Sequence, residues 1–296
     1  MAKNIDSMFL EYVHVTLFGI LGSVSLIVGA FFGYYFNIPK KIIAITMAFT
    51  VGVLTSSVCF ELLFEAYRYG GFVPIVIGFF IGLLTFTLAN IILNHFNIKK
   101  HVLLKDSQNE NCFDDRNNNQ NTHFYRANGF FSFKNLKNNL LNINVGNTYF
   151  NKYQIENFIT IISALLDGIP EALAIGLMLV VGGPISISIL ISIFIANLFE
   201  GVSSSKNMKL GGWKARSIFK VWGIVLLLAA FATLFSYSVF SHTDQYILSG
   251  ALGVSAGALI AIISDVLLPD AYAETQECTG FFVGLGLLFS FLLSHI

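Results

Sequence analysis

Charged residues are scarce in this sequence: they make up 11% of its 296 residues, whereas 55% are hydrophobic. Soluble domains contain roughly 25% charged residues, so the composition excludes an ordinary water-soluble domain and predicts an integral membrane protein. The formal net charge is zero, so there is no basic excess of the kind that attracts nucleic acid. We therefore expect the lipid bilayer, and no nucleic acid, among the partners of the chain.

Cysteine and histidine are few and widely separated. Cys59, Cys112 and Cys278 form an odd set without CxxC spacing, which argues against a disulfide framework or a zinc knuckle. His14 and His295 are single imidazoles, for which packing or interfacial roles are more common than metal ligation. The ligand chemistry that the sequence offers is therefore mainly that of oxygen.

Long apolar segments dominate the rest of the sequence. A helix that crosses ~30 Å of hydrocarbon needs ~20 mostly apolar residues. Seven segments meet this length, namely 13–36, 42–66, 72–96, 157–181, 185–206, 217–240 and 246–268. An eighth segment, 280–295, is shorter. We therefore predict an all-α integral membrane fold, an eight-helix transmembrane bundle.

The basic residues indicate the orientation, because Lys and Arg are enriched in cytoplasmic loops. If the N-terminus lies outside, the three inner loops carry two, eight and five basic residues, which is 15 of the 17. This predicts a multi-pass protein of the cell membrane with both termini extracytoplasmic. Residues 1–97 would form helices 1–3, 98–155 an Asn-rich cytoplasmic loop that is disordered, and 156–296 helices 4–8.

Two segments of the chain resemble each other. "GVLTSSVCFELLFEAY" (52–67) and "GALIAIISDVLLPDAY" (257–272) share Gly, three Leu, Ala and Tyr at matching positions. In the predicted topology these segments run in opposite directions, as in the inverted repeats of transporters. We therefore predict an inverted repeat.

Acidic residues mark both ends of a path through this repeat. Glu61 and Glu65 lie near the predicted outer end of span two. Asp270, Glu274 and Glu277 lie at the predicted inner end of span seven. We interpret the first pair as the outer entrance and the second set as the inner exit for a cation.

The fourth span contains two carboxylates and a proline in "LLDGIPEALAIGL" (165–177). Asp167 and Glu171 are four residues apart, so they share one face of a helix. Pro170 has no N–H, so the carbonyl of Leu166 loses its helical partner and becomes available as a further oxygen ligand.

Other polar groups lie at similar depth in spans five and seven. Asn197 and Glu200 share a helix face, and span seven adds Asp265. Each ionised group at the bilayer centre costs ~2.5–3.5 kcal/mol, so four carboxylates without a basic partner would cost on the order of 10 kcal/mol. Protons or metal cations must neutralise them, and oxygen ligands suit Mg, Mn, Fe(II) or Zn.

These residues resemble the ZIP (Zrt/Irt-like) family of divalent metal transporters. The family's fourth span carries His-Asn-x-Pro-Glu-Gly, where this chain has "DGIPEA" (167–172), and its fifth span a related motif, here "NLFEG" (197–201). "LPDAYAE" (268–274) is similar to the acidic stretch after the family's seventh span. The family has eight spans, both termini outside and a long cytoplasmic loop after span three.

The resemblance implies a metal site. Glu171 and Glu200 match the glutamates that bridge metals, Asp167 takes the place of a histidine ligand, and Asn197 takes a polar ligand position. The chain departs from the family at Gly168, where the motif has Asn. The candidate metal ligands are Asp167, Glu171, Asn197, Glu200 and Asp265.

We therefore expect a transporter that moves a divalent metal ion (Zn, Fe, Mn or Cd) as its substrate toward the cytoplasm by alternating access. It would need no cofactor and would not be an enzyme, and a homodimer is left open. One alternative is a proton-linked transporter whose carboxylates carry protons without metal. An intramembrane aspartyl enzyme that uses Asp167 and Asp265 lacks the Gly-x-Gly-Asp pattern of such proteases.

Overall fold

The computed structural model describes residues 2–109, 152–182 and 185–294. These described residues are helical apart from short turns, and they contain no strand. Seven helical segments in them are long and apolar enough to cross a membrane, which confirms the predicted all-α membrane-type bundle. They are Phe9–Tyr35, Lys40–Gly70, Phe72–Leu93, Ala164–Val181, Ile187–Leu210, Ala215–Phe240 and Gln245–Leu293.

The chain divides into two compact units, Met1–Leu93 with Thr160–Ile296, and Asn94–Ile159. In the second unit the described residues are the end of α4 and the start of α5, and most of the predicted Asn-rich loop lies outside the described residues. All contacts below are within the first unit. In chain order the elements are α1 (Ala2–Tyr35), α2 (Lys40–Ser57), η1 (Val58–Leu63), α3 (Phe64–Gly70), α4 (Phe72–Asn109), α5 (Lys152–Val181), α6 (Ile185–Leu210), α7 (Ala215–Phe240), α8 (Gln245–Ile262), η3 (Ile263–Leu267), α9 (Leu268–Thr275), η4 (Gln276–Cys278) and α10 (Thr279–Leu293).

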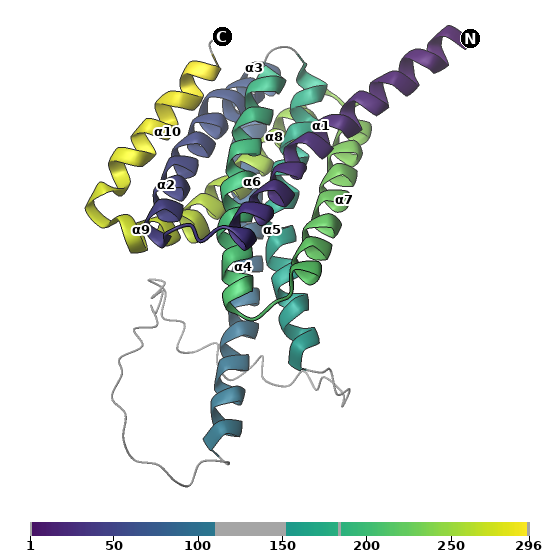
Figure 1. Ribbon diagram of the computed structural model, residues 1–296. Coiled ribbons are helices and arrows are strands. Elements are labelled where there is room, and N and C mark those ends of the chain that lie inside the picture. The colour runs from purple at the N-terminus through teal and green to yellow at the C-terminus, as the bar shows by residue number, and fades with distance from the viewer. Residues whose placement is uncertain (1, 110–151, 183–184, 295–296) are drawn as a thin grey trace, which may run out of the picture. The chain divides into compact units, whose positions relative to one another are not determined.

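The last apolar segment is not one straight helix. Gln276 ends α9 with a φ of 44°, a left-handed conformation that an α-helix does not continue through. After this turn α10 runs back along α2, as Figure 1 shows at the yellow end of the chain. The predicted eighth segment thus corresponds to α10, whose 15 residues are fewer than the ~20 of a full crossing.

Two π-helical segments interrupt the long helices at related places. η1 follows α2 and η3 follows α8, and both α2 and α8 have 18 residues. α2 begins at Lys40 and α8 at Gln245, while η1 begins at Val58 and η3 at Ile263, so both pairs are offset by 205 residues. The similar segments 52–67 and 257–272 have this same offset. π-Helical turns are uncommon and occur frequently at functional sites.

Glycines bring several of these helices into backbone contact. A Cβ on Gly52 of α2 would lie 1.9 Å from the carbonyl oxygen of Val283 in α10. A Cβ on Gly257 of α8 would lie 2.0 Å from the carbonyl oxygen of Phe79 in α4. Such small residues allow helix backbones to approach closely in a membrane. We call the set that contains α2 and α8 the α2/α8 group. Its members are α2, η1, α3, α4, α8, η3, α9, η4 and α10.

The remaining helices, α1, α5, α6 and α7, form a second set that we call the site group. A Cβ on Gly29 of α1 would lie 2.1 Å from the carbonyl oxygen of Leu198 in α6. Lys209 of α6 donates a 2.6 Å hydrogen bond to the carbonyl of Tyr34, near the end of α1. Trp222 of α7 is fully buried beside α6, where its indole nitrogen donates to a serine hydroxyl. α2 and α6 contact each other where the two groups meet.

The glycine contacts predict a specific loss of stability. Gly52→Ala should lower the free energy of unfolding by about 1–3 kcal/mol, because the new methyl group overlaps the backbone of α10. Gly284→Ala is the matched control, since a Cβ there meets nothing within 4 Å. Thermal unfolding of the purified protein in detergent measures both. Equal melting temperatures for the two variants would contradict the close contact of α2 and α10.

Candidate metal centre on α5 and α6

The helix α5 carries Asp167 and Glu171 on one face and continues through Pro170 without a break. Glu171 is buried, with 4% of its side chain exposed, and Asp167 is half-buried. Thr233 of α7 donates a 3.0 Å hydrogen bond to the carbonyl of Ala172, which holds this turn of α5 against α7. Asp167 and Glu171 therefore lie on a face of α5 that is turned toward the bundle, and the contact with α7 holds this part of α5 in place.

The helix α6 supplies Asn197 and Glu200. Asn197 is buried, and its amide nitrogen donates a 3.0 Å hydrogen bond to the carbonyl of Gly22 in α1. Glu200 is half-buried on the next turn. A Cβ on Gly201 would lie 2.4 Å from the carbonyl oxygen of Leu26, so α6 and α1 touch directly beside the site. The packing of α1 thus sets the rotation of α6.

The polar groups of α5 and α6 lie close enough to interact. The charge of Asp167 acts on both Glu171 and Glu200, and the side chain of Asn197 lies beside the Glu171 carboxyl. Glu171 Oε2 and Asn197 Oδ1 are both buried without a hydrogen-bond partner. Within the described part of the chain, the ion pair is formed by Arg68 and Glu65, away from these acids. The result is a group of acceptors with too few donors.

The carboxylates are near one another but do not form a finished metal cage. Among the described residues, no three His, Cys, Asp or Glu side chains lie at the spacing of metal ligands. Four of the five predicted ligands, Asp167, Glu171, Asn197 and Glu200, are thus neighbours. Their carboxylates are not at the spacing of metal ligands.

The predicted ligand Asp265 has a different environment. It lies in η3 with an exposed side chain. Asp270, near the start of α9, is also exposed, and its charge acts on Asp167. Glu274 in α9 and Glu277 in η4 are also exposed. In this segment the acid whose charge acts on Asp167 is thus Asp270, one of the residues assigned to the inner exit.

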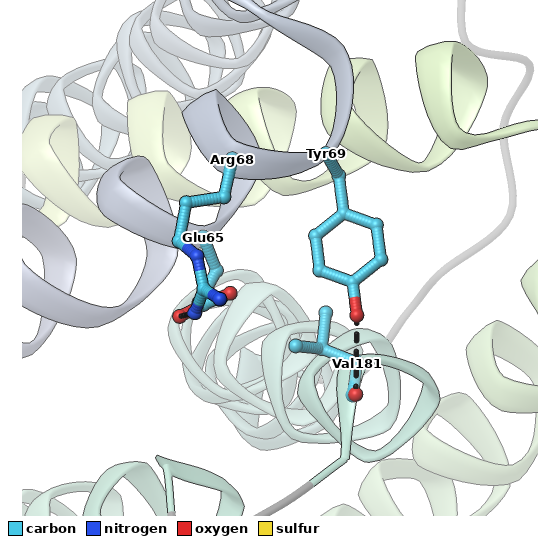
Figure 2. A network of polar contacts seen from close by, with 4 residues as sticks. All are labelled: Glu65, Arg68, Tyr69 and Val181. Atoms are coloured by element: carbon cyan, nitrogen blue, oxygen red, sulfur yellow. Dashed lines mark hydrogen bonds and ion pairs between the residues drawn. The ribbon is translucent and has the colours of Figure 1, made fainter.

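The two acids assigned to the outer entrance are buried. Glu61 and Glu65 each have 1% of the side chain exposed. Arg68 donates a 2.8 Å hydrogen bond to Glu65 and is itself largely exposed. Figure 2 shows this pair, with the hydroxyl of Tyr69 directed toward the carbonyl of Val181 at the end of α5, a contact of 3.3 Å. Each acid therefore accepts a hydrogen bond from another side chain, Glu65 from Arg68 and Glu61 from Ser188.

A group of serine hydroxyls was not predicted from the sequence. Ser290 of α10 lies 3.2 Å from Ser57 of α2 and 3.3 Å from Ser192 of α6, measured between hydroxyl oxygens. One turn before Ser192, Ser188 donates a 2.6 Å hydrogen bond to Glu61. The i, i+4 spacing of the two α6 serines in "ISISILISIF" was the available signal, but the partner helices could not be read from it.

Comparisons with known proteins do not assign this centre. No protein-family model matches the sequence, and no curated protein is significantly similar to it. The function is therefore inferred from the residues of the chain and from their geometry.

The unpaired acceptor oxygens of this centre predict that an amide in place of the Glu171 carboxyl stabilises the protein. Glu171→Gln should raise the free energy of unfolding by about 1–3 kcal/mol in chelator at neutral pH, because it removes a buried, unpaired acceptor oxygen. Asp244→Asn, at the exposed start of α8, is the matched control and should have little effect. Thermal unfolding measures the difference. A destabilised Glu171→Gln would mean that the acid is a satisfied, neutral part of the bundle.

Proposed function

We propose that this protein is a membrane transporter of divalent metal ions and that the carboxylates of α5 and α6 bind the metal in transit. The observation that carries this proposal is the pair of buried, unpartnered oxygens of Glu171 and Asn197, within the field of Asp167 and Glu200. Acceptor oxygens without donors in an apolar bundle require a cation. A metal ion is the cation that satisfies several such oxygens at once.

The looseness of the centre is consistent with transit of the ion. Conduction requires a site that binds strongly enough to admit an ion and weakly enough to release it. In the proposed cycle a dehydrated metal ion draws in Asp167, Glu171, Asn197 and Glu200. It then passes Asp270 and reaches Glu274 in α9 and Glu277 in η4. Oxygen ligands favour Mg, Mn or Fe(II), and hold Zn less tightly than imidazole does.

We further propose that the chain is a divergent ZIP-like transporter with eight spans and an inverted repeat. The shared offset of α2 with α8 and of η1 with η3 supports the repeat. The start of α1 and the end of α10 lie at the same end of the first unit in Figure 1, which an even number of crossings requires. The basic residues favour both of these ends outside the cell membrane, with uptake toward the cytoplasm.

A proton-linked transporter without metal is the second candidate function. It is favoured by one observation, that no three acidic, histidine or cysteine side chains of the described residues lie at metal-ligand spacing. A proton needs only one oxygen, so separated carboxylates could carry protons singly. This candidate predicts transport that depends on pH and not on divalent ions.

Transport by the reconstituted protein tests the proposal. Liposomes containing the full chain should take up at least one of Zn, Mn, Fe, Cd and Mg. Glu171→Ala and Glu200→Ala should each lower the initial rate by more than about tenfold, because a ligand oxygen is lost. Asp244→Ala should transport like the unmodified protein. Uptake of no metal, with proton flux that persists, would replace the metal transporter by the proton-linked one.

Cysteine accessibility tests the topology. In a background without Cys59, Cys112 and Cys278, a single cysteine at Asp244 should react with a membrane-impermeant thiol reagent from outside intact cells. A cysteine at Lys214, in the turn before α7, should react only after the membrane is permeabilised, because that turn is predicted to be cytoplasmic. The reverse pattern would invert the proposed orientation and the direction of uptake.

A further inference from the structure

Glu61 is a second buried acid, on a different helix from the α5 and α6 carboxylates. Its side chain lies in η1 and is 1% exposed. Oε1 accepts a 2.6 Å hydrogen bond from the hydroxyl of Ser188 in α6. Oε2 is buried and has no hydrogen-bond partner. The carboxyl thus has one neutral donor and nothing beside it that balances a negative charge.

The helices around η1 supply no counter-charge. α2, α3 and α8 pack against it, and α6 reaches it through Ser188. α8 contains no Asp, Glu, Lys, Arg or His, and the two lysines that begin α2 are about 30 Å away along that helix. Glu200 of α6 is twelve residues beyond Ser188, about 18 Å. Glu65 on the next turn is held by Arg68.

The number of oxygens around Glu61 decides which cation fits. A divalent metal takes four or more ligands, and here there are one carboxyl and one hydroxyl. A proton needs a single oxygen. We propose that Glu61 is a proton-binding site, protonated while η1 packs against Ser188 and ionised when the two separate and water enters.

The position of Glu61 connects this proton to the conformation of the bundle. The Glu61–Ser188 bond joins the α2/α8 group to the site group, as does the contact of Ser192 with Ser290. These are hydrogen bonds between neutral groups, and an ionised Glu61 would place an unpaired charge among them. A proton that binds the packed form better than the separated form shifts the equilibrium toward the packed form. Its role in transport rests on the proposed function.

Infrared difference spectroscopy detects this proton directly. Full-length protein in liposomes should show, at acidic relative to alkaline pH, a carbonyl stretching band of a protonated carboxyl that is missing in Glu61→Gln. Ser188→Ala should move this band to higher wavenumber, because the hydrogen bond to the carboxyl oxygen is lost. Glu65→Gln is the matched control and should keep the band, since it leaves Glu61 and its hydrogen bond with Ser188 in place. A spectrum unchanged by Glu61→Gln overturns the proposal.

Metal uptake at a series of external pH values tests the coupling. The pH profile of the unmodified protein should change in Glu61→Gln, which mimics the protonated acid at every pH, and should be retained in Asp244→Asn. An identical profile in Glu61→Gln overturns the coupling. If no metal is transported while the Glu61 band is present, the metal transporter fails and the proton site stands. If metal is transported and the band is absent, only the proton site fails.

Discussion

The cost of burying carboxyl groups in an apolar bundle is the constraint on which the rest of this structure depends. Asp167, Glu171 and Glu200 interact with one another, and the ion pair of the described residues lies elsewhere, at Arg68 and Glu65. Ionised groups at this depth are expensive, and no side chain nearby offsets them. Their energy therefore depends on what enters from solution. In the proposed function a mobile cation supplies the missing positive charge, which would distinguish the centre from an ordinary polar core.

The packing around the centre is correspondingly tight. α1 holds α6 through close glycine contacts and through the amide of Asn197, and α7 holds α5 through Thr233. Contacts between the two groups of helices include hydrogen bonds from Ser188 and Tyr69. Directional bonds of this kind are broken and reformed more easily than interlocked backbones, because water can replace the lost partner. The structure thus combines closely packed helix pairs with a boundary at which these polar contacts lie beside a shared apolar core from α2, α5, α6 and α8.

The two buried acid environments have different consequences for the cation they favour. Asp167, Glu171 and Glu200 share one region with a side-chain amide, which suits an ion that several oxygens can surround. Glu61 has one hydroxyl, that of Ser188, as its hydrogen-bond partner, which suits a proton. Both environments are apolar, so the number of available oxygen ligands is what separates the two cases. In the transporter proposed above, these two sites would link metal binding with protonation.

The positions of the apolar helices and the pairing of acids within one helix were determined by the sequence alone. The length of an apolar segment and the spacing of Asp167 and Glu171 are local properties of the sequence. Helix periodicity then predicts which residues share a helix face. Tertiary structure alone decided which residues of other helices contact these faces. Asp265 and Asp270 are both exposed, yet the charge that acts on Asp167 is that of Asp270. Glu61 contacts Ser188 across 127 positions of the chain. Such contacts depend on how helices rotate and approach at their glycines, which a pattern within one helix does not specify.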